Sequence, residues 1–389
     1  MTSYDWIVIG DGLSGAALSY ELARAGFSTL LLEKDIPPPN ATRFSYGGIA
    51  FWSATTPLTR QLCQESLDRH RSLSEEVGVD TEFRMMDLLL LIELNRDPLA
   101  IAQSYEKFAM PPQLITAAEA AEREPWINPS AISGALLGQH GHVNPEQMVT
   151  AYNAGFERHN GKLHQATVTG FLQQGDRIQG VRTDQGDFAA ANVAVCAGAM
   201  SRSLLTQAGI HPRVYFSQAE LLETPPLDLR LSHLVMPAEL QRFSLESRAG
   251  KAETDALWDE PGHEVAPPIL DVGAVQFLDG RMRLGQISRA LTSLDAPVDA
   301  AESEFKLRRA IAPLFPALEG VPSKWYRCQV AFSGDGLPLV GEVPGWTGIS
   351  LFTGFSNPFA LLPATASRFA QHLTGTPDDL IAQLDPARF

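Results

Sequence analysis

The sequence predicts an α/β protein whose first part is a Rossmann-type nucleotide-binding domain. Residues 4–34, YDWIVIGDGLSGAALSYELARAGFSTLLLEK, contain an apolar run, a glycine-rich turn, a helical pattern of apolar residues and a second apolar run. This order predicts a strand, a tight turn, a helix and a strand within about thirty residues. A chain of 389 residues, 44% of them hydrophobic, is also long enough for a second domain.

The glycine-rich turn has the residues that a dinucleotide site requires. Gly10 permits the tight turn, Gly12 lets the backbone approach a pyrophosphate, and Gly15 allows the helix to pack closely on the strand. Glu33 ends the second strand, where its carboxylate can accept hydrogen bonds from ribose hydroxyls but would repel a 2′-phosphate. The turn therefore predicts FAD or NAD rather than NADP. Asp11 is discordant, and we expect its side chain to turn outward, away from the phosphates.

Composition favours an enzyme that acts on a small molecule. The net charge is −15 and no segment is strongly basic, which argues against binding nucleic acid or an anionic membrane surface. Cys63, Cys196 and Cys328 are too few and too scattered for a disulfide framework or a zinc site, so we expect a cytoplasmic protein. The N-terminal segment has no basic leader and its apolar run is short, so we expect no transmembrane segment.

Apolar periodicity predicts the elements that follow the nucleotide-binding segment. Residues 58–77 have the pattern of an amphipathic helix, and the strand-like run 81–93 begins a different region. Residues 106–124 are mostly polar with a helical pattern, and another helix starts near Pro145, whose ring suits the first helical position. Turn residues at regular spacing predict a meander of strands over 161–191.

The second half of the chain predicts further strands and two helices. Residues 225–268 are irregular and rich in proline, and we expect surface loops there. Residues 275–285 resemble two strands joined through Asp279-Gly280, a dipeptide of tight hairpins. A helix is expected at 302–312, and the last helix is expected to start near Pro363 and to end before Gly375. Other strands are expected at 192–201, 213–222, 325–332, 337–341 and 348–354.

Three short motifs have more than one interpretation. Gly47 and Gly48 could let the backbone lie against a flat ring system, or they could form an ordinary turn. His140 and His142 lack a second cluster of ligands, so we expect solvent-facing or packing roles rather than metal binding. Cys196 has the features of a small core residue, with a reactive role as the alternative.

Five motifs follow one another along the chain: the opening turn with its LLLEK ending, His142–Pro145, Val195–Ser201, Asp335–Gly341, and Gly354–Ser356 with Pro363–Thr365. Taken in this order, they resemble the FAD-dependent amine and amino-acid oxidoreductases of the D-amino-acid oxidase, glycine oxidase and monomeric sarcosine oxidase superfamily. The resemblance implies a GR2-like FAD-binding domain from residues 1–80, 143–212 and 323–389. It also implies an α+β substrate-binding domain on a mixed sheet from residues 81–142 and 213–322.

The resemblance also implies which residues contact FAD. In this family the last helix points its N-terminus at the flavin, which carries over to residues 354–365. This chain departs from the pattern at Asn357-Pro358-Phe359, where relatives usually carry glycines. The residues implied to contact FAD are Gly10, Gly12, Leu13, Ser14, Gly15, Glu33, Lys34, Arg43, Phe44, Ser45, Gly47, Gly48, Val168, Ala197, Gly198, Cys328, Gly354, Phe355, Ser356 and Asn357.

Cys328 carries a further implication of the resemblance. In the sarcosine oxidase branch, a cysteine seven residues before the Asp of the later turn is bonded covalently to the flavin, and Cys328 stands seven residues before Asp335. Arg327 could help to hold the thiolate that such a bond requires. The alternative interpretation is a buried, unreactive thiol on a strand.

The substrate end departs from both branches of the superfamily. Residues 49–52 replace the arginines of sarcosine oxidase-like members, and Val330 replaces the arginine of glycine oxidase-like members. Arg283 stands near the position of the lysine that promotes reaction with oxygen, and is our candidate catalytic residue and carboxylate partner. A surface position for Arg283 is the alternative. The expected substrate contacts are Phe51, Trp52, Arg283 and Asn357.

The function implied by the resemblance is oxidation of the C–N bond of an amine or amino acid, including secondary or N-substituted ones. The α-hydrogen would pass as hydride to flavin N5, and the imine would hydrolyse. Oxygen or another acceptor would reoxidise the flavin. Two alternatives stay open: oxidation of a 2-hydroxy acid, which a pocket histidine would favour as the base, and a flavin-bearing subunit that relays electrons within a complex.

Overall fold

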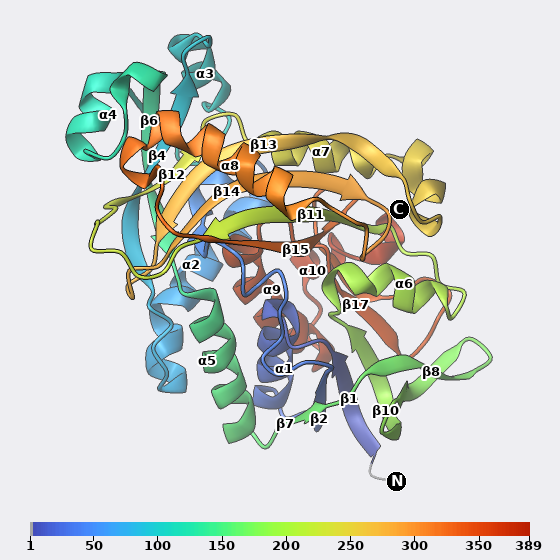
Figure 1. Cartoon of the computed structure of the whole chain (residues 1–389). Coiled ribbons are helices and arrows are strands. Elements are labelled where there is room, and N and C mark those ends of the chain that lie inside the picture. Colours follow the sequence, from blue (N-terminus) through green and yellow to red (C-terminus); the bar gives the residue numbers. More distant parts are fainter. Residues whose placement is uncertain (1–2) are drawn as a thin grey trace.

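The structure is a computed structural model that describes residues 3–389, and it contains two β-sheets (Figure 1). In the first sheet the strand order is β16-β17-β10-β1-β2-β7, and β9 and β8 extend it from β10. β1 pairs in parallel with β10 and with β2, so the carboxyl ends of these strands meet at one edge. The strands are β1 (Ser3–Ile9), β2 (Thr29–Glu33), β7 (Lys162–Gln165), β8 (Val168–Gln174), β9 (Arg177–Thr183), β10 (Gly186–Val195), β16 (Leu339–Glu342) and β17 (Ile349–Thr353).

Four helices form the layer beside the first sheet, in the lower half of Figure 1. α1 contacts α5 and α9, and α2 packs along α9. A shared apolar core fills this layer, with Trp6 of β1 and Phe369 of α9 in edge-to-face contact. The helices are α1 (Leu13–Arg24), α2 (Pro57–Val77), α5 (Pro145–Arg158) and α9 (Pro358–Leu373).

The close approach of α1 to β1 depends on glycine at position 15. A Cβ atom added to Gly15 would lie 1.7 Å from the carbonyl oxygen of Gly10, a distance that no real side chain tolerates. Gly10 itself has φ +101°, in the left-handed region that favours glycine. The glycine-rich turn is therefore built as the sequence predicts.

The second sheet is mixed, as predicted, with the strand order β15-β11-β14-β13-β12-β4-β6-β3 and with β5 on β6. Only the β12–β4 pair is parallel. β3 and β15 pair with this sheet, although both lie in segments expected to belong to the FAD-binding domain. The expected domain boundaries stay a prediction. The strands are β3 (Gly48–Ile49), β4 (Arg84–Glu93), β5 (Gln113–Ile115), β6 (Ile132–His142), β11 (Val214–Glu223), β12 (His233–Pro237), β13 (Glu264–Gln276), β14 (Met282–Leu291) and β15 (Lys324–Ser333).

The two faces of the second sheet have different neighbours. Alternate residues such as Leu89 and Leu91 join Leu307 and Ile311 of α8 in one apolar core. The residues between them project from the opposite face, which covers the cavity described below. Around this sheet and the chain ends lie α3 (Pro98–Ser104), α4 (Ala117–Arg123), α6 (Ser201–Thr206), α7 (Gln241–Ala249), α8 (Ala300–Leu314), α10 (Asp379–Ala382) and the 3-10 turns η1 (Phe51–Ser53), η2 (Pro129–Ala131), η3 (Gly198–Met200), η4 (Ala252–Asp259), η5 (Pro316–Leu318) and η6 (Pro386–Arg388).

The last long helix begins at Pro358, so the prediction of a start near Pro363 was wrong. Pro363 has no N–H, and the carbonyl of Phe359 therefore loses its helical partner. Nε2 of His70, on α2, lies 2.7 Å from that carbonyl oxygen and donates to it. The amide of Ala364 donates to Oγ of Ser66, also on α2. Two side chains of a neighbouring helix thus compensate for the proline.

Two other expectations differ from the structure. The helical pattern expected at 106–124 is a helix only over α4, because Pro111-Pro112 interrupts it and β5 follows. The region 225–268, expected to be surface loops, contains the strand β12 and the helix α7. α7 lies against β13, and this position matters for the site.

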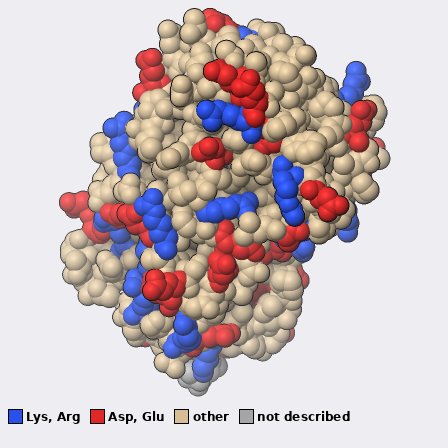
Figure 2. Space-filling view, turned by 90° about the vertical axis from the view of Figure 1, so that its left-hand side faces the viewer, with Lys and Arg blue, Asp and Glu red and all other residues tan. Residues whose placement is uncertain are grey.

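Charged side chains of both signs share the face shown in Figure 2, where Lys and Arg alternate with Asp and Glu instead of forming a patch of one sign. Among residues 3–389, no helix has an apolar stretch long enough to cross a lipid bilayer. Within the same residues, no group of three or more His, Cys, Asp or Glu side chains is placed to hold a metal ion.

Candidate active site

A cavity of about 1440 Å³ is lined by residues from both sheets. One part of its wall is the glycine-rich turn at the carboxyl end of β1, together with the end of β2. Another part is the inner face of the second sheet, with side chains such as Leu88, Leu234 and Cys328. A long ligand could therefore reach from the nucleotide turn to the second sheet within one cavity.

Glu33 ends β2, as predicted, and lines the cavity beside the glycine-rich turn. One carboxylate oxygen accepts the amide N–H of Asp11 at 2.7 Å, and the other accepts that of Asp35 at 3.1 Å. These bonds hold the carboxylate at the cavity wall beside the glycine turn.

Asp11 turns away from the cavity, toward α5 rather than toward solvent. Nδ2 of Asn153 donates to both of its carboxylate oxygens, at 3.0 and 2.9 Å. Burial raises the pKa of Asp11 to about 7, the bonds from Asn153 oppose that shift, and the charge of Glu33 adds to it. The discordant acid is thus removed from the phosphate position.

Most residues that were expected to contact FAD line the cavity. Gly15, Arg43 and Gly47 do not: Gly15 is enclosed by the turn, Arg43 lies 3.1 Å from the Glu146 carboxylate, and a Cβ at Gly47 would meet the Val143 carbonyl at 2.1 Å. The expected residues that line the cavity are Gly10, Gly12, Leu13, Ser14, Glu33, Lys34, Phe44, Ser45, Gly48, Val168, Ala197, Gly198, Cys328, Gly354, Phe355, Ser356 and Asn357.

Cys328 is buried on β15 with its side chain at the cavity. Burial raises the pKa of its thiol to about 12, whereas the positive charges of Arg283 and Arg242 act in the opposite direction. Arg327 donates to the carbonyl of Ala296 at 2.8 Å and is not among the groups that shift this thiol. The cations that influence Cys328 are therefore Arg283 and Arg242, and the expected role of Arg327 has no support from its contacts.

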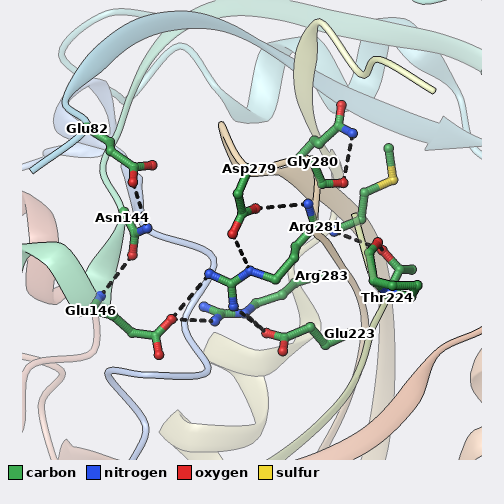
Figure 3. A network of polar contacts seen from close by, with 12 residues as sticks. Glu82, Asn144, Glu146, Glu223, Thr224, Asp279, Gly280, Arg281 and Arg283 are labelled. Carbon is green, nitrogen blue, oxygen red and sulfur yellow. Dashed lines mark hydrogen bonds and ion pairs between the residues drawn. The ribbon is translucent and has the colours of Figure 1, made fainter. Parts of the chain in front are cut away.

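Arg283 is fully buried and does not line the cavity. Figure 3 shows it beneath Arg281, with Nε donating to the Glu223 carboxylate at 2.9 Å and Nη2 at 3.7 Å from that of Glu146. Nη1 donates to the carbonyl of Ser45. Burial lowers its pKa, and Glu223 opposes that shift. Arg283 is neither a surface residue nor a cavity residue, and it ties the segment around Ser45 to β14.

Of the other three expected substrate contacts, two line the cavity and one does not. Trp52 lines the cavity, and its indole N–H donates to Nδ1 of His140 at 3.0 Å. Asn357 also lines the cavity and lies 3.4 Å from Oγ of Ser53. Phe51 is buried in the apolar core and does not reach the cavity.

Both histidines of the 140–142 motif are buried. His142 packs against Phe277 with its ring centroid 5.3 Å away, whereas His140 lies at the cavity wall. Burial lowers the pKa of each to about 3, so both are neutral at physiological pH.

Arg242 is the residue that the sequence interpretation missed. It is the second residue of α7, lines the cavity, and donates from Nη2 to the carbonyl of Ser356 at 2.9 Å. Asp271 accepts the amides of Gln241 and Arg242 at 3.1 Å each and fixes the start of the helix. The Glu246 carboxylate lies 3.6 Å from Nη1, too far for a hydrogen bond. The guanidinium therefore keeps donors for a ligand.

A weak sequence signal for Arg242 existed. Arg242 and Glu246 are four residues apart, the spacing of an ion pair on a helix. The prolines of the surrounding region outweighed that signal. Burial raises the pKa of both Glu246 and Asp271, so the two carboxyls beside Arg242 are weaker acids than exposed ones.

Comparison with known proteins gives consistent results. Residues 5–372 match the family described as DAO, FAD dependent oxidoreductase. The chain is 26% identical over 384 residues to a glycine oxidase of Pseudomonas aeruginosa, covering 95% of this chain and 94% of that one. It is 31% identical over 220 residues to a monomeric sarcosine oxidase of Streptomyces avermitilis, covering 54% and 55% of the two chains.

Solved structures share the fold. The crystal structure of glycine oxidase from Geobacillus kaustophilus superposes with a TM-score of 0.79 at 21% identity, and each chain is covered in full. L-proline dehydrogenase from P. horikoshii gives a TM-score of 0.78 at 21% identity, covering 100% of this chain and 98% of that one.

Proposed function

The chain belongs to the family of FAD-dependent oxidoreductases, and on this premise we propose that it oxidises the C–N bond of an amine or an amino acid. The observation that carries the proposal is the position of Arg242 on the wall of the same cavity that the glycine-rich turn lines. The residues of the glycine-rich turn would hold FAD, which when bound would supply the redox chemistry, with the α-hydrogen of the amine leaving as a hydride. The resulting imine hydrolyses in water.

The residues at the nucleotide end fit FAD. Gly12 precedes α1 and has no side chain to cap the helix. The amide of Leu13 donates to Oγ1 of Thr42 at 3.0 Å, and the amides of Ser14 and Gly15 would bind phosphate oxygens. Glu33 is held at the cavity wall, where it can accept from ribose hydroxyls. The same cavity extends to the face of the second sheet, where a substrate could bind.

Arg242 would bind the carboxylate of an amino-acid substrate. Its fork of N–H donors suits a planar carboxylate, and the protein uses only the donor to Ser356 in a hydrogen bond among the described residues. Val330 lines the same cavity without a polar group, so Arg242 would take over the task that an arginine performs there in glycine oxidase-like members.

The beginning of α9 would stabilise negative charge at the cavity. Asn357, Pro358 and Phe359 all line the cavity at this helix N-terminus. A helix N-terminus carries about half a positive charge, which favours an anion beside it. The apolar walls exclude water and favour the uncharged form of the amine, which is the form that gives up hydride.

The experiment is anaerobic mixing of the FAD-containing protein with a panel of amino acids and amines, followed by air. Bleaching of the flavin identifies substrates, and the return of colour in air identifies oxygen as an acceptor. Arg242→Met should raise KM for amino acids at least tenfold and leave KM for amines without a carboxylate unchanged. Arg248→Met, on the exposed face of the same helix, is the matched control. Equal effects on both substrate classes would contradict the role of Arg242.

Oxidation of a 2-hydroxy acid is the less supported alternative. His140 does lie at the cavity, but its Nδ1 accepts the Trp52 indole N–H, so Nε2 carries the proton in the neutral ring. Because burial also lowers its pKa to about 3, His140 is a poor base for a hydroxyl group.

We also propose a covalent bond between Cys328 and the flavin. The position of the thiol at the cavity supports it, and the charges of Arg283 and Arg242 oppose the effect of burial, which raises the pKa of this thiol to about 12. After acid precipitation, yellow colour should stay with the protein and should be released from Cys328→Ala. Cys63→Ala is the control, because Cys63 is a second buried thiol at the cavity wall. Colour released from the unmodified protein would rule the bond out.

A further inference from the structure

Three aromatic side chains form one cluster on the cavity wall. Trp52, Tyr105 and Phe108 all line the cavity. The rings of Trp52 and Tyr105 are stacked with centroids 6.0 Å apart, and Phe108 meets both rings edge-on, at 5.4 and 5.2 Å. The cluster offers a broad aromatic surface to whatever occupies this part of the cavity.

The polar atoms of this cluster are already used by the protein. The Trp52 indole N–H donates to His140, and the Tyr105 hydroxyl donates to the carbonyl of Ala238. Burial raises the pKa of Tyr105, so its hydroxyl stays protonated. The cluster therefore offers aromatic faces to a ligand. Its indole N–H and hydroxyl donors are not free to bond a polar group of that ligand.

Backbone hydrogen bonds hold the cluster in place. The amide of Ala109 donates to the carbonyl of Ala54 at 2.9 Å, and that of Met110 donates to the carbonyl of Trp52 at 3.3 Å. The segment after α3 is thus fastened to η1, so the aromatic surface exists before a ligand arrives. When the surface is preformed, binding of an apolar group does not include the free energy of ordering that surface.

Aliphatic side chains from two strands extend this region of the wall. Leu88 and Leu90 alternate on β4, and Leu234 and Met236 alternate on the adjacent strand β12, so all four project from the same face of the sheet into the cavity. Two charged side chains, Lys107 and Glu239, also line the cavity, and both are exposed: Lys107 lies over the Phe108 ring with its Nζ 5.2 Å from the centroid, and Glu239 pairs with Arg96. We call the surface formed by Trp52, Tyr105 and Phe108 the aromatic chamber, and the four aliphatic side chains beside it carry no charge.

We propose that the substrate carries a large apolar or aromatic side chain, which binds in this aromatic chamber. The inference rests on the proposed function, and it separates this protein from relatives named for glycine and sarcosine, whose amines have almost no side chain. Burial of one large apolar side chain favours binding by about 10- to 100-fold. Substrate preference should therefore rise with apolar size.

Turnover tests this preference directly. Glycine, alanine, leucine, phenylalanine, aspartate and lysine are mixed anaerobically with the FAD-containing protein, the chiral ones as both enantiomers and all of them also as N-methyl forms, and the second-order rate constant for flavin bleaching is measured. We expect the rate constant for phenylalanine or leucine to be at least tenfold higher than that for alanine, and to exceed that for glycine by a larger factor. Fastest bleaching by glycine or by a charged amino acid would overturn the inference while supporting the proposed function.

Ligand binding tests the chamber without turnover. Binding of 3-phenylpropanoate and of propanoate is followed by the change in flavin absorbance, and the phenyl compound should bind at least tenfold more tightly. Equal affinities would overturn the inference. If the phenyl compound binds more tightly and yet no amine or amino acid bleaches the flavin, the chamber stands and the proposed function fails.

A matched pair of variants locates the effect. Phe108→Ala should reduce the preference for phenylalanine over alanine, and for 3-phenylpropanoate over propanoate, at least fivefold. Phe305→Ala removes an exposed phenylalanine of α8 and should leave both ratios unchanged. Flavin content and unfolding midpoint confirm that each variant is folded. Ratios in Phe108→Ala that equal those of the unmodified protein would place the apolar group elsewhere.

Discussion

Replacing Asp11 by Asn should stabilise the protein at neutral and alkaline pH. The Asp11 side chain is buried against α5, beside a second carboxylate, Glu33. A carboxyl whose pKa is higher in the folded than in the unfolded chain binds its proton more tightly when folded. Its contribution to stability is therefore complete below about pH 4 and is lost as the pH rises through about 7.

The magnitude follows from the two pKa values. Burial raises the pKa of Asp11 from 3.8 to about 7, and each unit corresponds to about 1.4 kcal/mol, so the complete loss is about 4 kcal/mol. Between pH 5 and pH 8 the unfolding free energy should fall by about 2.5 kcal/mol through this group alone. The Asn variant lacks the titration, and its amide can also donate to Oδ1 of Asn153, which has no hydrogen-bond partner among the described residues.

Urea unfolding at pH 5, 6, 7 and 8, at one fixed FAD concentration, measures the effect. The difference in unfolding free energy between Asp11→Asn and the unmodified protein should grow steadily with pH. Asp187→Asn, on the exposed part of β10, should show a constant difference near zero. A difference for Asp11→Asn that does not change across this range would refute the argument that its carboxyl titrates in the folded protein near neutrality.

Two further predictions concern side chains that hold the site in shape. His70→Ala should lower the unfolding free energy by about 1–3 kcal/mol, because the Phe359 carbonyl loses its donor; adding Pro363→Ala should restore part of the loss in urea unfolding, since residue 363 regains an N–H. Arg283→Met should cost about 1–3 kcal/mol and weaken FAD retention, because the Glu223 carboxylate and the Ser45 carbonyl both lose a donor, although Arg281 still lies 3.6 Å from Glu223; an equal cost in the double variant with Glu223→Gln would contradict this explanation.

The nucleotide end could be predicted from the sequence because its signals are local. The turn at Gly10, the close contact at Gly15 and the carboxylate of Glu33 all lie within the first strand, helix and strand. Few residue types are compatible with the backbone geometry of this turn, so the residues present there indicate the structure. Asp11 departs from that pattern, and only Asn153, 142 residues away, shows how its charge is accommodated.

The continuation of α9 through Pro363 could not be predicted because its cause lies far away in sequence. Pro363 is one signal for a helix start, and Asn357-Pro358, where the helix does start, is a second local signal that the prediction did not use. The donor that satisfies the freed carbonyl of Phe359 is His70, 289 residues earlier. Local propensity was overridden by a contact that only the packed helices α2 and α9 create.

Arg242 and Arg283 divide the tasks that one cation was expected to perform. Sequence spacing pointed to Arg283 because it precedes Gly285 on a strand of the cavity sheet, but the segment around Ser45 lies between that side chain and the cavity, and its guanidinium is committed to Glu223 and to the Ser45 carbonyl. A guanidinium that does not line the cavity can shape a site and shift the pKa of a neighbour such as Cys328, but it does not reach a substrate carboxylate, even though Nη2 of Arg283 has no hydrogen-bond partner among the described residues. Arg242 keeps that capacity because it reaches the cavity from a helix end, where the backbone carbonyl of Ser356 takes one donor. The cation that matters for substrate binding is therefore identified by uncommitted donors at the cavity wall, a property of the folded chain that residue spacing does not encode.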